Sequence, residues 1–268
     1  MKLFDSHAHL GAPELYPEAA SILARARAAG VEGVIAVGSG YGLEANAYAV
    51  ALAEEHPDVW ASAGLHPHDA SAWDARAERA IEGWLAHPRV RAVGECGLDY
   101  WYEHAPRAQQ EHCLRAQIAL ARSTALPLVI HVRASRDSRD AYEDLLRIFD
   151  AEGADSVGGV IHCFTGDAEL AKACLERSFD LSFSGILTFQ NAGALREVAR
   201  ALPLGRLLVE TDSPLLAPAP HRGRRNEPAW VGRVVEVLAN LHGRSADEVA
   251  AQTHRRARAA FGIGESSP

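Results

Sequence analysis

The chain has 268 residues and a formal net charge of −8 at pH 7. Its length allows one large domain or two smaller ones, each with a sizeable core. Hydrophobic residues make up 48% and charged residues 23%, which is ordinary for a globular protein. The acidic balance excludes a protein that coats polyanions non-specifically, and it leaves open an enzyme that handles nucleic acid at one local site.

The sequence predicts a cytoplasmic protein without a membrane partner. No run approaches the roughly 18 apolar residues that cross a bilayer, and Asp5, His7 and His9 interrupt any signal-peptide core at the N-terminus. The cysteines show no CxxC spacing, so we expect four reduced thiols. They are Cys96, Cys113, Cys163 and Cys174. The oligomeric state is left open between monomer and dimer.

Short apolar runs with strand character recur along the chain. They cover residues 2–7, 33–38, 59–66, 90–96, 127–132, 158–164, 180–185 and 206–212. Between them lie Ala-, Leu-, Glu- and Arg-rich stretches with helical periodicity, such as 17–30 and 107–123. Strands that alternate with helices at roughly 25–35 residues per unit predict a parallel sheet.

Eight such units in a chain of this length favour an α/β fold of the (β/α)₈ TIM-barrel type. A doubly wound open sheet is the main alternative. The sequence contains no linker, low-complexity tract or internal repeat. We therefore expect a single domain over residues 1–268, completed by one or two closing helices at about 228–262.

Ionisable residues follow most of the predicted strands. In "LFDSHAHL", residues 3–10, the side chains of His7 and His9 share one face because strand side chains alternate. The carboxyl ends of barrel strands form the active-site rim. The residues expected there are His7, His9, His66, Glu95, His131, His162 and Asp212.

Several imidazoles packed together without a metal would be poorly satisfied. Four histidines with Glu95 and Asp212 offer enough ligands for two divalent ions with open positions for water and substrate. Glu95 is placed to bridge the ions, and Asp212 either completes one ligand set or takes a proton from water. Such a site supports hydrolysis, and two ions suit a phosphodiester.

Other polar residues are candidates for binding the substrate. His66 in "HPH" is placed to contact a phosphate or act as an acid, and the loop at 221–228 is rich in arginine. The candidate substrate-binding residues are His66, Arg133, Arg222, Arg225 and Asn226. Asn226 alternatively caps the next helix. Three tryptophans near the predicted rim are candidates for stacking on a base, although core or interface packing is favoured for each of them singly. They are Trp73, Trp101 and Trp230.

With these motifs assembled, the chain resembles the TatD family of metal-dependent deoxyribonucleases in the metallo-dependent hydrolase superfamily. The motifs are "DSHAHL", "GLHPH", "GECGLDY", "IHCFTG", "ETDSPLLAP" and "RGRRNEP", and they span residues 3–228. The resemblance implies a TIM barrel with one or two divalent ions held at His7, His9, Glu95, His131, His162 and Asp212. It also implies nuclease activity supported by Mg²⁺ or Mn²⁺, typically 3′-to-5′ on single-stranded DNA or DNA 3′ ends, with Zn²⁺ often found in such sites.

The chain departs from the family pattern at two positions. Ala8 stands where relatives often have Cys, and Arg256 stands where they commonly have Asn in "T-x-x-N". We expect Ala8 to have no consequence for the metal site and Arg256 to affect only the packing of the last helix.

Two other functions compete with a DNA phosphodiesterase. One is a metal-dependent hydrolase of a small amide, lactone or phosphoester. Many such barrels use a lysine on the fourth strand, where this chain has Glu95. The other is a barrel that stores metal or binds a partner without turnover, which the complete ligand set disfavours. An open basic groove that includes Arg222 and Arg225 would favour nucleic acid, and a deep closed pocket would favour a small substrate.

Overall fold

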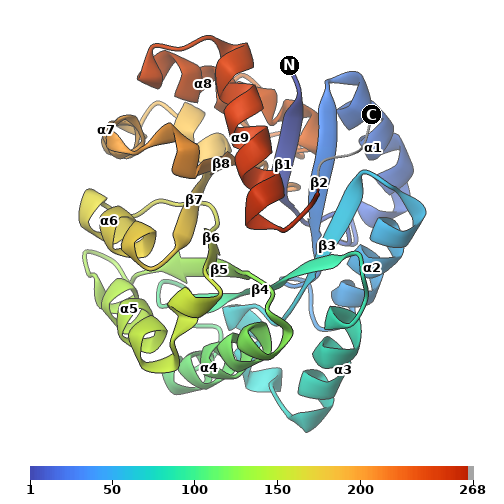
Figure 1. The fold of residues 1–268 in the computed structure, drawn as a ribbon, viewed down its shortest axis with the longest axis vertical. Helices are drawn as coiled ribbons and strands as arrows, with labels where there is room; N and C mark the ends of the chain where they lie inside the picture. Colours follow the sequence, from blue (N-terminus) through green and yellow to red (C-terminus); the bar gives the residue numbers. More distant parts are fainter. Residues whose placement is uncertain (265–268) are drawn as a thin grey trace.

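The computed structural model describes residues 1–264 as eight parallel strands in one sheet, ordered β1 to β8 as in the sequence (Figure 1). The strands are β1 (Leu3–Ala8), β2 (Val31–Val37), β3 (Val59–Ala63), β4 (Val90–Asp99), β5 (Leu128–Arg133), β6 (Gly159–Ile161), β7 (Phe179–Phe183) and β8 (Leu207–Val209). The helices are α1 (Ala19–Ala28), α2 (Ala45–Glu55), α3 (Ala75–Leu85), α4 (Arg107–Thr124), α5 (Asp140–Glu152), α6 (Ala168–Glu176), α7 (Gly193–Ala201), α8 (Gly232–His242) and α9 (Ala246–Ala260). The expected alternation of strands and helices is confirmed.

The first and last strands meet and turn the sheet into a barrel. The backbone N–H of Asp212 donates to the His7 carbonyl at 2.9 Å, and that of His9 donates to the Ser213 carbonyl at 2.8 Å. These bonds bring two segments from opposite ends of the chain side by side. The fold is therefore a (β/α)₈ TIM barrel, and the alternative of an open sheet is wrong.

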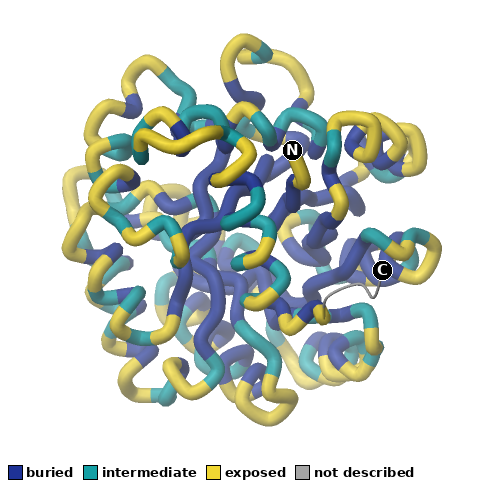
Figure 2. The backbone as a smooth tube through the Cα atoms, turned by 45° about the horizontal axis from the view of Figure 1, so that its top comes forward, coloured by how far each residue is buried: buried dark blue, intermediate teal, exposed yellow. Residues whose placement is uncertain are grey.

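Two layers of apolar side chains hold the barrel together. Alternate strand residues pack outward against the helices in one continuous core. The other residues point inward and form a smaller cluster that includes Phe4, Trp60 and Val129. Phe261, just after α9, completes this inner cluster, so the C-terminal helix closes the end of the barrel at which the strands begin. Figure 2 shows the buried strands at the centre and exposed turns at the periphery.

The two departures from the family pattern lie within this packing. Ala8 is fully buried and bridges to Ser213 at the β1–β8 junction. Arg256 donates to Asp180 of β7 at 2.5 Å, and Arg206 donates to the same carboxylate. Arg256 therefore fastens α9 to the barrel wall, away from the ends of the strands where the candidate site lies.

Two further expectations concern termini and thiols. The closing helices predicted at about 228–262 correspond to α8 and α9. All four cysteines are free, and Cys96, Cys113 and Cys174 are buried. Within residues 1–264, no helix has both the length and the apolar character needed to cross a membrane.

Candidate metal centre and active site

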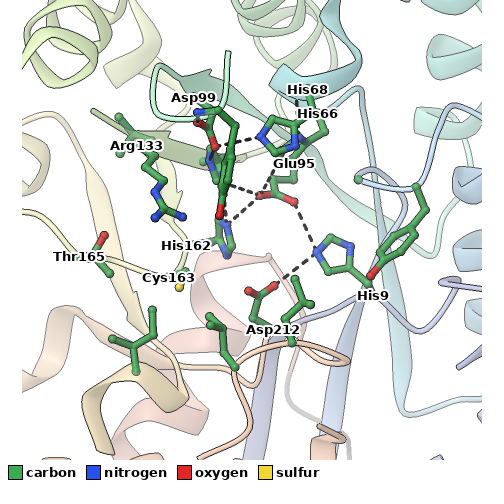
Figure 3. Close-up of a pocket in the computed structure, with 18 residues that line it drawn as sticks. His9, His66, His68, Glu95, Asp99, Arg133, His162, Cys163, Thr165 and Asp212 are labelled. Carbon is green, nitrogen blue, oxygen red and sulfur yellow. Dashed lines mark hydrogen bonds and ion pairs between the residues drawn. The ribbon is translucent and has the colours of Figure 1, made fainter. Parts of the chain in front are cut away.

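The carboxyl ends of the strands surround a pocket of about 600 Å³ (Figure 3). Six of the seven predicted rim residues line it, and they come from β4 and β5 and from the segments just after β1, β3, β6 and β8. They are His9, His66, Glu95, His131, His162 and Asp212. The seventh, His7, is fully buried directly behind them, with its ring stacked on that of His162 at 3.8 Å.

One oxygen of Glu95 faces the histidines of the first strand. Glu95 Oε2 lies 3.5 Å from His7 Nε2 and 3.6 Å from His9 Nε2. These two ring nitrogens are only 3.2 Å apart. Asp212 Oδ1 joins the same group, at 3.4 Å from His9 Nε2 and 3.7 Å from His7 Nε2. Two carboxylates and two imidazoles therefore converge on one small volume.

The other oxygen of Glu95 faces a second group of histidines. Glu95 Oε1 lies 2.8 Å from His162 Nε2, 3.2 Å from His131 Nδ1 and 3.4 Å from His66 Nε2. In Figure 3 the Glu95 carboxylate lies between His162 on one side and His9 on the other. A single buried carboxylate thus joins two groups of nitrogen donors.

Oxygen atoms on the far side of three of these rings fix their orientation. His9 Nδ1 lies 3.0 Å from the Ser39 carbonyl, and His131 Nε2 lies 3.0 Å from Asp99 Oδ2. His162 Nδ1 lies 3.1 Å from Glu210 Oε1. A neutral imidazole that donates its N–H outward presents the lone pair of its other nitrogen inward, as metal-binding histidines do.

His66 has the opposite orientation. Its Nδ1 accepts the backbone N–H of His68 at 3.1 Å, so the neutral ring carries its hydrogen on Nε2, which points toward Glu95. Burial lowers the pKa of His66 to about 4, and the ring is therefore neutral near pH 7. His66 offers the pocket a hydrogen-bond donor, whereas the neutral forms of His9, His131 and His162 would offer lone pairs.

The electrostatics of the site favour bound positive charge. Burial acts to raise the pKa of Glu95, but the imidazoles, His162 first, hold it well below its usual range. Burial likewise opposes ionisation of His162, yet Glu95 and Glu210 raise its pKa well above 6.5. The His9 hydrogen bond lowers the pKa of Asp212 against the effect of burial. Glu95 and Asp212 therefore remain ionised, and their negative charge stabilises positive charge beside them.

A close approach of β4 and β5 places Glu95 beside His131. Gly97 has φ +146°, and a Cβ built on it would lie 1.8 Å from the carbonyl oxygen of His131. Only glycine fits such a contact at this φ. The glycine in "GECGLDY" therefore allows the two strands to bring their polar residues together.

The donor set fits divalent metal ions. Ligand bonds of about 2.1 Å place neighbouring ligand atoms about 3.0–3.4 Å apart. Most distances between the imidazole nitrogens and carboxylate oxygens of this site lie close to that range. Glu95 Oε2 and His7 Nδ1 are buried without a hydrogen-bond partner. Three sets of residues place possible metal-ligand atoms within 4.8 Å of one another. They are His7–His9–Glu95, His7–His162–Asp212 and His66–Glu95–His131.

The predicted substrate residues do not all reach the pocket. Arg133 lines it, as does His66. Arg225 instead donates to Glu18 at 2.9 Å and to the Glu14 carbonyl at 2.7 Å.

The other two predicted residues of that loop do not line the pocket either. Arg222 lies over the Phe189 ring at 3.5 Å. Asn226 is fully buried, and its amide donates to the carbonyls of Thr211 and Leu215. The contacts of Arg222, Arg225 and Asn226 hold the loop after β8 in place, and a role of these residues in substrate binding stays a prediction.

Three polar residues of the site were missed from the sequence. Asp99 and Glu210 orient His131 and His162, and His68 shares Asp99 at 3.0 Å. Asp99 stands in "GECGLDY", Glu210 in "ETD" and His68 in "HPH". Their place two or four residues from a predicted rim residue was the available signal, since metal-binding histidines usually have hydrogen-bond partners close by.

A barrel whose strand ends carry two histidine groups around a shared carboxylate is the architecture of a metal-dependent hydrolase. A family model described as "TatD related DNase" matches residues 4–262. The chain belongs to the TatD family.

Named relatives and a solved structure agree with this placement. The chain is 41% identical over 261 residues to the uncharacterized metal-dependent hydrolase YabD of Bacillus subtilis, which covers 97% of this chain and 99% of that protein. It is 35% identical to a Citrobacter rodentium protein named 3′-5′ ssDNA/RNA exonuclease TatD, with 97% and 98% covered. The crystal structure of the Escherichia coli K12 TatD homologue YjjV superposes with a TM-score of 0.89 at 28% identity, covering 98% of each chain.

Proposed function

We propose that the chain, as a single catalytic domain, is a two-metal phosphodiesterase that removes nucleotides from the 3′ end of single-stranded DNA. The observation that carries the proposal is Glu95, whose two oxygens face separate groups of imidazoles. One ion would be held by His7, His9 and Asp212, the other by His131 and His162, with Glu95 shared. The name of the Citrobacter relative supports the choice of substrate and polarity.

The mixture of imidazole and carboxylate donors bears on which ion binds. Imidazole suits Zn²⁺ and also accepts Mn²⁺, whereas Mg²⁺ prefers oxygen ligands and keeps several waters. The inner faces of His7, His9, His131 and His162 present four nitrogens. We therefore infer that Mn²⁺ or Zn²⁺ binds more tightly than Mg²⁺.

The chain's own residues would divide the chemistry among them. Divalent ions held at this site would neutralise the phosphodiester and lower the pKa of the attacking water. Asp212, ionised and beside His9, would accept the proton of that water. The His66 Nε2–H would donate to a phosphate oxygen, and Arg133 at the pocket wall would contact a neighbouring phosphate.

A second candidate keeps the metal centre and changes the substrate. Arg222 and Arg225 do not line the pocket, and one of its walls is apolar, formed by Ile186, Leu215 and Leu216. These observations favour a small phosphoester or lactone over a long strand. Arg133 also lines the pocket and has no carboxylate partner within residues 1–264, which favours the nucleic acid.

One experiment separates these functions. Metal-stripped protein, with Mn²⁺, Zn²⁺ or Mg²⁺ restored, is incubated with 5′-labelled single-stranded DNA and with bis(p-nitrophenyl) phosphate. We expect a ladder that shortens from the 3′ end, blocked by a phosphorothioate at the last 3′ linkage but not at the first 5′ linkage. Glu95→Gln should lose at least about 100-fold activity on both substrates, since it removes a shared ligand.

The matched control is Glu197→Gln on the exposed surface of α7, where Glu197 pairs with Arg200. It should retain full activity. Intact DNA together with rapid hydrolysis of the aryl phosphodiester would move the assignment to the small substrate. Full activity of Glu95→Gln on either substrate would contradict the two-metal site itself.

A further inference from the structure

A cluster of exposed aromatic and cationic side chains adjoins the pocket on its β4–β5 side. We call Trp101, Tyr102, Arg133 and Arg136 the rim platform. Trp101 and Tyr102 follow β4, while Arg133 ends β5 and Arg136 lies in the next loop. Trp101 is 42% exposed and Tyr102 is 53% exposed, which is unusual for large apolar side chains in this molecule.

The arginines of the rim platform lie against its rings. The guanidinium carbon of Arg133 is 4.9 Å from the centre of the Trp101 ring and 5.0 Å from that of Tyr102. That of Arg136 is 5.6 Å from the Trp101 ring. At these distances the guanidinium groups make cation–π interactions with the rings. Such interactions hold the guanidinium groups in place without neutralising their charge.

The charges of the rim platform are unpaired within residues 1–264. Neither Arg133 nor Arg136 has a carboxylate partner or a side-chain hydrogen bond there, whereas the nearby Arg107 pairs with Glu103 and Asp140. The chain as a whole carries a net charge of −8. Two unpaired guanidinium groups beside a metal pocket therefore form a local site for anions.

One carboxylate connects the rim platform to the candidate metal centre. Asp99 Oδ1 accepts the backbone N–H groups of Trp101 at 3.0 Å and Tyr102 at 2.9 Å. Its other oxygen, Oδ2, lies 3.0 Å from His131 Nε2. Tyr102 and Arg133 also line the pocket. The rings are thus held at a fixed position relative to the reacting centre.

A single nucleic-acid strand presents the groups that this surface would recognise. Its unpaired bases stack on aromatic rings, and its phosphates accept hydrogen bonds from guanidinium groups. The pocket residues that follow β7 and β8 include the apolar side chains of Ile186, Leu215 and Leu216. A strand whose 3′ end lies at the ions would leave the pocket toward the side that carries positive charge.

We propose that the rim platform binds the nucleotides on the 5′ side of the scissile phosphate, with a base on Trp101 or Tyr102 and phosphates at Arg133 and Arg136. This assignment rests on the proposed nuclease function and extends it. It makes the platform the source of preference for single strands, since paired bases keep their faces inside the duplex.

The test compares two substrates across Trp101→Ala, Arg133→Ala and the control Arg200→Ala, which alters an exposed arginine on α7. We expect KM for a single-stranded oligonucleotide to rise roughly tenfold in the first two variants, because one stacked base or one phosphate contact is lost. The kinetic constants of Trp101→Ala for bis(p-nitrophenyl) phosphate should stay unchanged, since Trp101 does not line the pocket that holds this small substrate. Trp101→Phe should restore most of the affinity.

Direct binding gives a readout independent of turnover. Fluorescence anisotropy with a labelled, cleavage-resistant phosphorothioate oligonucleotide and the metal-loaded protein should show the same loss of affinity. Placing abasic sites near the 3′ end should weaken binding to the wild-type protein and have little effect on Trp101→Ala.

The outcomes distinguish the two proposals. If the wild-type protein degrades single-stranded DNA and the variants match it, the platform is wrong and the nuclease stands. Equal losses of Trp101→Ala on both substrates would overturn the platform as well, because they would place the defect in the metal pocket. If the wild type neither cleaves nor binds oligonucleotides but hydrolyses the aryl phosphodiester, the nuclease function fails, and the platform fails with it.

Discussion

The orientation of His131 and of His162 depends on a carboxylate on the far side of each ring. His131 presents Nδ1 to Glu95 because Asp99 holds its Nε2–H, and His162 presents Nε2 because Glu210 holds its Nδ1–H. These carboxylates decide which nitrogen is free to bind an ion. Asp99 and Glu210 are therefore positioning residues, and their replacement should alter metal affinity before it alters the fold.

Asp99→Asn tests this role. The amide can still accept the N–H groups of Trp101 and Tyr102, but its NH₂ group faces His131 and favours a hydrogen on Nδ1, on the metal side. We expect one of two ions to bind roughly 10–100-fold more weakly. Isothermal titration of stripped protein with Mn²⁺ measures this change.

The matched control for Asp99→Asn is Asp150→Asn, which alters an exposed ion pair with Arg177. It should bind both ions as the wild type does. Two ions of undiminished affinity in Asp99→Asn would show that His131 does not depend on Asp99.

Arg225 illustrates how a partner distant in sequence changes the role expected of a residue. The sequence places it in an arginine-rich loop suited to phosphate, but its guanidinium group is engaged by Glu18 and the Glu14 carbonyl. We expect Arg225→Ala to leave KM for an oligonucleotide within about twofold of wild type, because Arg225 contacts Glu18 and does not line the pocket. The fold should also persist, since an exposed ion pair contributes little to stability. Steady-state kinetics beside Arg133→Ala measures KM, and comparable losses in both variants would return Arg225 to the substrate site.

At the scale of elements, the loop after β5 is held by a single acidic residue. Asp140, the first residue of α5, accepts the Ser135 hydroxyl at 2.7 Å and the Ser135 N–H at 3.0 Å. Its carboxylate also pairs with Arg107 of α4 at 2.9 Å. This arrangement fixes the segment that carries Arg136, so the rim platform depends on it.

The pKa of Asp140 gives a prediction about pH. Partial burial opposes ionisation, but the hydrogen bonds from Ser135 and Ala141 and the charge of Arg107 lower this pKa from 3.8 to about 2. The folded state therefore binds fewer protons than the unfolded state between these values. The resulting stabilisation is complete above pH 4 and decreases as the pH falls toward 2.

Urea unfolding of wild type and Asp140→Asn at several pH values checks this sign. The wild type should have the higher midpoint at pH 6, and the difference should shrink below pH 4. The exposed Asp150→Asn serves as control, and a difference independent of pH would contradict the assignment.

The sequence predicted the order of elements better than their ends. The eight strand runs were recognisable because β-rich segments alternate with helical ones, yet β4 extends to Asp99 and β6 stops at Ile161. Where a strand ends depends on pairing with its neighbour, as in the contact of Gly97 with His131. Pairing across strands is not encoded within one run of residues.

The candidate site was predictable for a topological reason. All strands of a parallel barrel end at one rim, so polar residues at strand ends must converge without any knowledge of distances. Which nitrogen each histidine presents, and that Arg225 finds Glu18, depend on side-chain contacts between distant parts of the chain. Those contacts require the structure.

The whole molecule separates its sources of stability from its candidate chemistry. Apolar residues such as Phe4, Trp60 and Phe261 fill the end of the barrel where the strands begin. The opposite end buries carboxylates and imidazoles, of which Glu95 Oε2 and His7 Nδ1 have no hydrogen-bond partner. Buried polar atoms without partners lower the stability of the folded state, so this end should depend on bound ions.

Metal removal should therefore lower the thermal stability of the wild type. An ion that binds only the folded state contributes about 2.7 kcal/mol at 100 times its Kd, which corresponds to a rise in Tm of roughly 5–10 °C for a chain of this size. Differential scanning calorimetry of stripped protein, titrated with Mn²⁺, should show Tm rising with ion concentration. Glu95→Gln should show a much smaller rise because it lacks the shared carboxylate.

Phe261→Leu is the matched control at the other end of the barrel. It reduces packing in the inner cluster and should lower Tm by a similar amount with and without Mn²⁺, so that the metal-dependent rise is preserved. A wild-type Tm that does not respond to Mn²⁺ would mean that the histidine groups around Glu95 hold no ion. A rise abolished in Phe261→Leu would mean that the two ends are coupled, because the inner cluster would then determine the geometry of the metal site.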